Sequence, residues 1–405
     1  MQINKPKQVW QLAFEGEWPT SVVFLGDSRR LAAANRAGQI FVWELPESAP
    51  EGTKTSGEEA APDLAPVRQL VGHTNGVSRL VATADGKTLV SASLDHTVRL
   101  WNPAAAPSGQ SEVVLNVKFR ERQTRGKSKD EIEQILTGNP TQVETVSPSS
   151  VLTGHEDWIE SLAMSRDERT LLSGDERARV IAGDLSSPNG SGERTAKERS
   201  RMAGHAWNGI AAVALSADGS VAAVSEYCSK RDDFDIPAAA LKLWNTSDGS
   251  EKQDLLKQYL PKLDAGSTSY GAAQVWRKFV ARGLVAADFS PDGSLLALGQ
   301  GGETDTGQIH IFEVASGKFL RSISGHRYGV CDLKFSADGK YVLSGGRDTM
   351  LRICQVENGK EVAALGTSRG GQFKDWLNSV AISPDQSTVA AADIAGMVHV
   401  WNLNG

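Results

Sequence analysis

The stretch GHTNGVSRLVATADGKTLVSASLDHTVRLWN, residues 72–102, aligns without a gap on GHRYGVCDLKFSADGKYVLSGGRDTMLRICQ, residues 325–355. Each copy contains Gly-His, a segment that alternates apolar and polar residues, Asp-Gly, a second alternating segment, a polar turn and a third alternating segment. Alternation with period two is typical of half-buried antiparallel strands. Asp-Gly falls where two such strands need a tight hairpin. The chain is therefore predicted to repeat a β-structured unit.

The same layout recurs in five further segments with decreasing fidelity. Asp-Gly returns at the hairpin position in 218–219 and 292–293. A single unit leaves both faces of its sheet exposed, so such units become stable when they stack radially. The sequence thus predicts an all-β, seven-bladed propeller that occupies residues 1–405 as one domain. Its units begin near residues 17, 72, 154, 204, 283, 325 and 375.

Within residues 72–102, GH…SASLDHTVRLW resembles the signature of the WD40-repeat family, and the resemblance extends over essentially the whole chain. It implies a WD40-type propeller that serves as a platform for protein or peptide partners. It also implies a hydrogen-bonded tetrad of His, Ser or Thr, Asp and Trp in each well-preserved unit. By residue match, the tetrads are His73, Ser91, Asp95 and Trp101 in unit two, and His326, Ser344 and Asp348 in unit six, where Cys354 stands in the Trp position.

Ser91, His73 and Asp95 are also the residue types of a hydrolase triad. A catalytic serine needs an exposed Oγ beside an oxyanion hole, often on a GxSxG turn. Ser91 instead lies in the middle of a predicted strand, and the GxSxG at residues 366–370 does not include it. We therefore interpret the three residues as structural and predict that the chain is not an enzyme. A propeller hydrolase or lactonase is the less favoured alternative.

The tetrad is incomplete in other units. Unit three has His155 and Ser173, but Arg177 stands at the Asp position and Gly183 at the Trp position. Units one and seven have alanine at the Ser position. We expect these blades to be held mainly by apolar packing.

The N-terminus is predicted to close the ring. The chain ends on the third strand of its last unit, and residues 9–15 align on 67–73, the outer strand that precedes unit two. An N-terminal strand would complete the last blade and remove an exposed sheet edge.

Residues outside the repeats are predicted to form insertions. In one of them, Ser128 and Glu131 form a capping box ahead of a predicted helix. The family resemblance places 46–66 and 103–148 on the bottom face, and 227–239 and 301–307 on the top face. The predicted insertions are 46–66, 103–148, 186–200, 227–239 and 251–282.

Several kinds of site are disfavoured. The histidines and cysteines lack zinc-ligand spacing, so no metal or other cofactor is predicted. No GxxxxGK[ST] phosphate loop is present. The basic run in 118–129 contains a single aromatic residue, Phe119, and the net charge is −6, so nucleic acid is not favoured as a partner. Acidic loops remain an alternative calcium site, although solvated loops are favoured: Asp232, Asp233, Asp235, Glu303 and Asp305.

The sequence also bears on location. No run of 18 apolar residues is present, so no membrane span is predicted. The three cysteines include no CxxC pair, which favours free thiols in a reducing compartment. The N-terminus lacks the apolar stretch of a signal peptide. We therefore expect a cytoplasmic location.

A set of aromatic residues is the best candidate for a partner-binding surface. Trp18, Trp158 and Trp376 occupy one equivalent position directly before the first strand of their units. Aromatic and arginine side chains are typical anchors of protein interfaces. The alternative is that each Trp packs between neighbouring blades. The full candidate set on the top face is Trp18, Trp158, Trp207, Arg327, Tyr328, Arg347, Lys374 and Trp376.

These observations favour a non-catalytic scaffold that binds a protein or peptide partner through its top face. The alternative is a structural module of a larger assembly that acts through its insertions.

Overall fold

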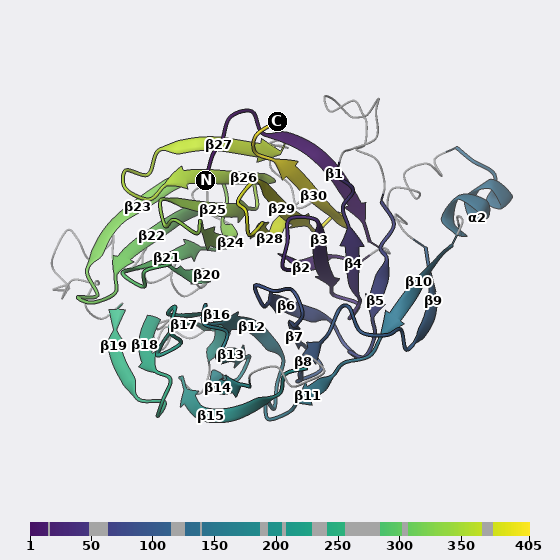
Figure 1. Cartoon of the computed structure of the whole chain (residues 1–405). Coiled ribbons are helices and arrows are strands. Elements are labelled where there is room, and N and C mark those ends of the chain that lie inside the picture. The colour runs from purple at the N-terminus through teal and green to yellow at the C-terminus, as the bar shows by residue number, and fades with distance from the viewer. Residues whose placement is uncertain are drawn as a thin grey trace.

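The computed structural model describes residues 1–14, 17–47, 64–114, 126–137, 140–186, 193–204, 208–228, 241–255, 284–301, 307–366 and 376–405. Seven sheets stand radially around a central channel of about 300 Å³, which the first strand of each blade lines (Figure 1). The predicted all-β, seven-bladed WD40-type propeller is confirmed.

Each blade runs from the channel outward. The first strands are β2 (Pro19–Phe24), β6 (Val77–Ala82), β12 (Ile159–Met164), β16 (Asn208–Leu215), β20 (Leu284–Phe289), β24 (Val330–Phe335) and β28 (Leu377–Ile382). The second strands are β3 (Arg30–Asn35), β7 (Leu89–Ser93), β13 (Thr170–Asp175), β17 (Val221–Cys228), β21 (Leu295–Gln300), β25 (Tyr341–Gly346) and β29 (Thr388–Asp393).

The two outer positions of each blade complete the sheets. The third strands are β4 (Ile40–Glu44), β8 (Val98–Trp101), β14 (Arg179–Leu185), β18 (Leu241–Asn245), β22 (Gly307–Glu313), β26 (Met350–Gln355) and β30 (Met397–Asn402). The outer strands are β5 (Arg68–Leu70), β11 (Ser150–Leu152), β15 (Ala196–Ala203), β19 (Glu251–Asp254), β23 (Phe319–His326), β27 (Glu361–Gly366) and β1 (Lys7–Ala13).

The hairpins between first and second strands need a residue with positive φ. Gly86 of blade 2 adopts φ 65°, a conformation that costs glycine little. Blades 3 and 7 place Glu168 and Gln386 there, at φ 57° and 58°. Both side chains reach the preceding blade, where Glu168 accepts from the Ala84 N–H at 2.5 Å and Gln386 from the Ala337 N–H at 3.1 Å. A bond between blades thus offsets the backbone strain.

The N-terminal strand closes the ring, as predicted. β1 pairs antiparallel with the C-terminal strand β30, with Leu12 opposite Val398. Its apolar side chains Trp10 and Leu12 are buried in one cluster with Trp43 of blade 1. The closure therefore joins the last blade to the first through both backbone pairing and apolar burial.

The 103–148 insertion forms structure that the sequence did not predict. Its hairpin, β9 (Gly109–Val113) and β10 (Thr141–Val146), leaves blade 2 and extends blade 1 to six strands. β10 pairs parallel with β5, and Arg68 forms an ion pair with Glu144 at 3.2 Å. The helix α2 (Lys129–Thr137) was predicted, and its capping box forms, with Glu131 accepting from the Ser128 N–H at 2.9 Å.

The other insertions are only partly described. The predicted insertion 186–200 is too long, because β15 begins at Ala196 and supplies the outer strand of blade 3. The segment 251–282 was predicted to contain an outer strand, and β19 is that strand. Most of 46–66, nearly all of 227–239 and residues 256–282 lie outside the described residues.

One apolar position recurs at each contact between blades. It lies on the third strand, cross-strand from an apolar residue of the second strand, and its side chain packs against the preceding blade. We call it the interblade position; from blade 1 to blade 7 it is occupied by Trp43, Trp101, Gly183, Trp244, Phe312, Cys354 and Trp401. Blade 3 alone has no side chain there.

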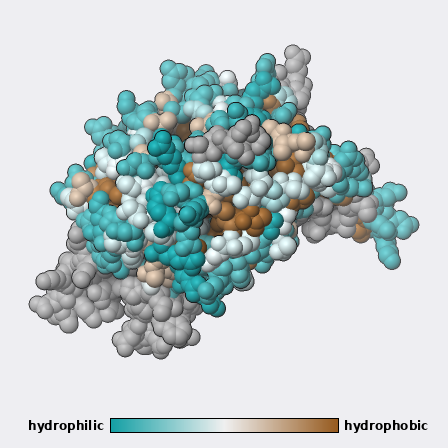
Figure 2. Space-filling view, turned by 60° about the horizontal axis from the view of Figure 1, so that its bottom comes forward, coloured by the Kyte–Doolittle hydropathy of each residue, from teal (hydrophilic) through white to brown (hydrophobic). Residues whose placement is uncertain are grey.

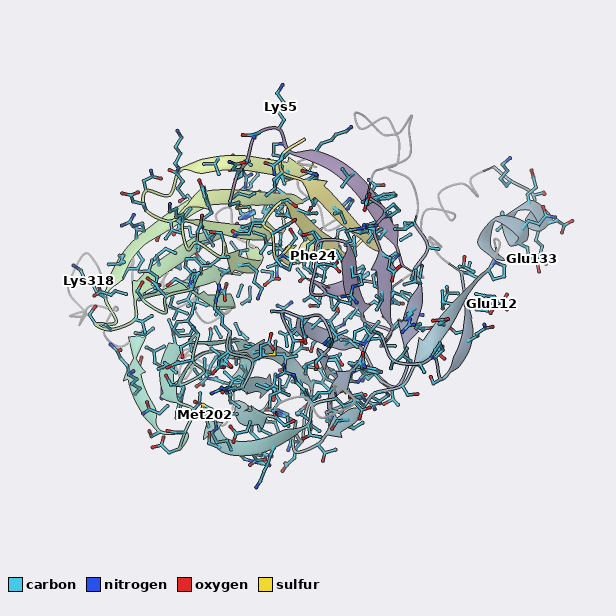
Figure 3. All side chains as sticks on the ribbon, viewed as in Figure 1. Lys5, Phe24, Glu112, Glu133, Met202 and Lys318 are labelled. Atoms are coloured by element: carbon cyan, nitrogen blue, oxygen red, sulfur yellow. The ribbon has the colours of Figure 1, made fainter. Side chains whose placement is uncertain are left out.

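The surface is mixed in polarity. Figure 2 shows a face on which hydrophilic residues predominate and apolar residues gather in smaller patches between them. In Figure 3 the labelled Phe24 lies near the central channel, while Lys5 and Lys318 point outward from the ring.

Candidate functional site

The candidate site lies where the first strands begin, at one mouth of the central channel, which we call the top face. Trp18, Trp158 and Trp376 take equivalent places there. The backbone carbonyl of each accepts a hydrogen bond at 3.0 Å from the first residue after the second strand of its own blade. The side chains of Trp18 and Trp158 are 50% and 46% exposed, and Trp376 is half-buried. At least two of the three therefore do not serve as packing between blades.

Arginine side chains accompany the aromatics of blades 6 and 7. The Arg347 guanidinium lies 4.1 Å from the ring centroid of Trp376, and that of Arg327 lies 5.6 Å from the ring of Tyr328. Cations in these positions are attracted by the negative face of the ring. Blades 6 and 7 thus present paired cationic and aromatic groups.

Blade 3 contributes several carboxylates to the same face. The Asp157 carboxylate accepts a hydrogen bond from the backbone N–H of Trp158 at 2.8 Å, and the Tyr227 hydroxyl of blade 4 donates one to Glu176. Burial raises the pKa of Glu160 on β12; Arg36 opposes the rise and Glu176 adds to it. Arg177 forms an ion pair with Asp157 at 3.0 Å and Arg179 forms one with Glu156 at 2.5 Å. Blade 3 therefore carries charges of both signs, whereas blades 6 and 7 present Arg327 and Arg347.

Glu160 was not among the predicted site residues. It occupies a bulge position at the channel mouth that carries neutral donors in three successive blades. There Asn378 donates to the Pro19 carbonyl at 3.0 Å and Thr20 to the Val77 carbonyl at 2.6 Å. In the same way, the Ser78 hydroxyl donates to the Ile159 carbonyl at 2.5 Å. The sequence signal that could have identified Glu160 is its charge: it is a carboxylate at a position where the aligned units have neutral residues.

Two predicted members of the top-face set, Trp207 and Lys374, lie outside the described residues. The described members fall in two groups rather than one. Arg327, Tyr328, Arg347 and Trp376 come from the adjacent blades 6 and 7, and Trp18 lies on the next blade, blade 1. Trp158 lies apart from them, on blade 3.

The structure brings the unit-two tetrad together below this face. His73 Nδ1 lies 2.8 Å from Asp95, and its Nε2 lies 2.7 Å from Ser91 Oγ. The Trp101 indole N–H donates to the same Oγ at 2.8 Å. Ser91 is 0% exposed, so its hydroxyl cannot reach a substrate. The geometry fits a buried structural network rather than a nucleophile.

Ionisation within this tetrad follows from burial and hydrogen bonding. Burial lowers the pKa of His73, although Asp95 opposes the shift. Burial also opposes ionisation of Asp95, but hydrogen bonds from Thr97 and His73 lower the pKa of Asp95 to about 2. A neutral imidazole therefore donates its Nδ1–H to a charged carboxylate, and its Nε2 accepts the Ser91 hydroxyl proton.

Blades 3 and 6 contain related networks. In blade 6, His326 lies 2.8 Å from Asp348 and 2.7 Å from Ser344. In blade 3 the expected loss of the carboxylate is wrong. Asp175, two residues before Arg177, lies 2.8 Å from His155 Nδ1, and Ser173 Oγ lies 2.7 Å from Nε2. In blade 3 the carboxylate thus comes from the end of β13, whereas in blades 2 and 6 it comes from the turn after the second strand.

Two further findings concern metals and membranes. Within the described parts of the chain, no three His, Cys, Asp or Glu side chains gather in a geometry suited to a metal ion. The predicted acidic loops, with Asp233 and Glu303, lie outside the described residues. No helix in the described ranges has the length and apolar character needed to cross a bilayer.

Comparison with known proteins identifies repeats in this chain. The family description "WD domain, G-beta repeat", WD40, matches residues 64–102, 146–181, 317–354 and 365–402. Each segment covers inner strands of blade 2, 3, 6 or 7 together with all or part of the outer strand of the preceding blade. The segments include both units in which the spacing predicted a tetrad.

Individual relatives match over shorter stretches. The chain is 31% identical over 98 residues to Autophagy-related protein 16 of Arabidopsis thaliana, which covers 24% of this chain and 19% of that protein. It is 35% identical over 118 residues to WD repeat and SOCS box-containing protein 1 of Homo sapiens, covering 29% and 26%. A WD repeat-containing protein 55 homolog of Drosophila persimilis is 29% identical over 117 residues, covering 28% and 22%. The matches thus span about a quarter or less of each relative's length. Together with the seven-bladed ring, the four matched segments show a propeller that contains WD40 repeats.

Proposed function

We propose that the chain is a non-catalytic interaction scaffold that binds a protein or peptide partner across its top face. The observation that carries this proposal is the exposure of Trp18 and Trp158 at 50% and 46%, on the face that also carries the Arg347–Trp376 pair. Exposed aromatic side chains at the mouth of a channel are candidate interface anchors, because Trp and Arg are enriched among the residues that dominate binding energy at protein interfaces. The relatives, which include WD repeat proteins, are consistent with an interaction role.

The charge distribution suggests the orientation of the partner. Its acidic groups would face Arg327 and Arg347, and its basic groups would face Glu160 and Glu176. Complementary charges of this kind mainly set the association rate and the register. Binding should therefore weaken as ionic strength rises.

Affinity capture with quantitative mass spectrometry tests the proposal. The triple variant Trp18→Ala/Trp158→Ala/Trp376→Ala is expected to lose the main partners of the wild-type chain, with each anchor contributing about 1–2 kcal/mol or more. The control is Val67→Ala, an exposed apolar side chain ahead of β5 on the outer side of blade 1. A triple variant that folds and retains every partner would refute the top-face assignment.

A second candidate is a structural module that acts through its insertions. It is favoured by the β9–β10 hairpin and α2, which stand out from the ring (Figure 1). Replacement of residues 104–147 by a short linker would separate the two roles. It should abolish capture under the second role and leave it intact under the first.

A further inference from the structure

A cavity of about 220 Å³ lies between blades 2 and 3, away from the channel mouth. Its walls are mainly apolar and come from both blades. Blade 2 contributes Val98 and Leu152, and blade 3 contributes Leu162, Leu171 and Ile181. His155 and Ser173 provide polar groups within this lining.

The cavity follows from the glycine at the interblade position. Gly183 is paired with Leu171, as Trp101 is paired with Leu89 in blade 2. Trp101 fills the space between its own blade and blade 1, where it packs in one cluster with Val42. Gly183 has no side chain for the corresponding space, and it lines the cavity.

Ser173 can accept a hydrogen bond of the kind that the equivalent serine of blade 2, Ser91, accepts from Trp101. In blade 2, Ser91 donates to His73 and accepts the Trp101 indole N–H at 2.8 Å. In blade 3, Asp175 holds the Nδ1–H of His155, so Ser173 donates to His155 Nε2. Among the described residues no side chain donates to Ser173 Oγ. Ser173 Oγ therefore retains acceptor capacity, and Ser173 lines the largely apolar cavity.

The cavity reaches the surface at the outer strands. Val151 of β11 lies at its rim and is 46% exposed, one of the few large apolar side chains left in water. Lys197 and Glu198 of β15, both exposed, also line it. A ligand can thus enter from the side of the ring without opening a blade.

We propose that this cavity binds an indole group, whose ring fills the space left by Gly183 and whose N–H donates to Ser173 Oγ. The volume is sufficient, because a dry apolar cavity of about 150 Å³ binds benzene. The position of the donor is set by blade 2, where the Trp101 indole makes this bond to the equivalent serine. The site lies outside the top face and is independent of the proposed function.

Titration of the full chain with free indole, followed by ligand-observed NMR and calorimetry, tests the site. Indene has the same ring shape without the N–H and serves as the matched probe. Indole should bind about three- to tenfold more tightly, the effect of one net hydrogen bond. Equal affinities would overturn the hydrogen bond to Ser173, and no binding of either at millimolar concentration would overturn the site.

Substitutions locate the binding. Gly183→Trp should fill the cavity and abolish indole binding. Ser173→Ala should reduce the preference for indole over indene to about one. Ser344→Ala, which removes the equivalent serine from blade 6, is the matched control and should leave that preference unchanged. Unchanged binding by Gly183→Trp would place indole elsewhere and refute the proposal.

If Gly183→Trp does not fold, Ala196→Phe directs a ring into the same space from the partly exposed strand β15, and the same loss is expected. A blocked tryptophan, N-acetyltryptophan amide, distinguishes the two sources of an indole group. Binding at least as tight as indole indicates a tryptophan carried by a partner chain. Binding of indole alone indicates a free small molecule.

Discussion

At the scale of single residues, the serines at the centre of the tetrads support different numbers of partners. Ser91 forms hydrogen bonds with both His73 and Trp101, whereas Ser173 forms one only with His155 among the described side chains. Removal of a hydroxyl leaves each buried partner without its bond, at about 1–3 kcal/mol for each group. The three-residue arrangement that resembles a triad is therefore a stability device.

Ser91→Ala is accordingly expected to destabilise the chain by about 2–6 kcal/mol, and Ser173→Ala by about 1–3 kcal/mol. Urea denaturation monitored by circular dichroism measures both free energies of unfolding. Ser344→Ala, in a blade with Cys354 at the interblade position, should behave like Ser173→Ala. Equal losses for Ser91→Ala and Ser173→Ala would show that the indole N–H of Trp101 contributes nothing through this bond.

Buried His310 gives the fold a pH dependence. Burial lowers the pKa of His310 from 6.5 to about 4. In the unfolded chain the imidazole takes up a proton near pH 6.5, while the folded chain resists it until about pH 4. Its contribution to stability is therefore full above pH 6.5 and is lost as the pH falls toward 4. His310→Gln should flatten the decrease of the melting temperature over this interval. A decrease as steep as in the wild type would contradict this account.

The residues of the networks were predictable where spacing is preserved and not elsewhere. His73, Ser91, Asp95 and Trp101 follow from the match with unit six and the family signature. Asp175 was missed because the carboxylate comes from two residues earlier, at the end of β13, and still reaches the imidazole. Alignment by position cannot detect that two different backbone sites place a carboxylate at one point in space.

At the scale of elements, β1 is the strand on which closure depends. It buries Trp10 and Leu12 and pairs along β30. Each such side chain stabilises the folded state by about 1.5–3 kcal/mol when buried. The strand should therefore contribute a large part of the total stability of a domain, which is about 5–15 kcal/mol.

Deletion of residues 1–14 should lower the melting temperature sharply, and a synthetic peptide of the same sequence should restore part of the loss. Differential scanning calorimetry measures both effects. Lys7→Ala, at an exposed position of the same strand, is the control and should change the melt little. An unchanged melting temperature after the deletion would refute closure by β1.

Elements inside the repeats were predictable from alternation, whereas the β9–β10 hairpin was not. Within β9 and β10 only Val113, Val143 and Val146 are apolar, so the pattern of a half-buried strand is weak. Its partner β5 belongs to the preceding blade, and the parallel pairing joins residues distant in sequence. Non-local pairing of mainly polar strands leaves little local signal.

At the scale of the whole molecule, the ring is a series of blade contacts of unequal strength. Six of the seven interblade positions carry a side chain, from Cys354 to tryptophan, and blade 3 carries Gly183. Near the channel, two hydrogen bonds join blades 2 and 3: the Ser78 hydroxyl donates to the Ile159 carbonyl, and the Ala84 N–H donates to Glu168. The outer part of this contact lacks a side chain at the interblade position, and the outer strand of blade 2, β11, has only three residues.

Local opening of the ring should therefore begin at the outer part of this contact. Amide hydrogens of β11 and β14 are expected to exchange faster than those of β26 and β27, because regions with fewer buried apolar contacts open at lower free energy. Gly183→Trp would restore a buried side chain worth about 1.5–3 kcal/mol and slow exchange there by about 10- to 100-fold. Hydrogen exchange with mass spectrometry resolves these strands, and exchange in β26 provides the internal reference. Equal rates across the two regions, unaltered by Gly183→Trp, would mean that the cavity does not weaken the ring and that the inner bonds alone hold blades 2 and 3 together.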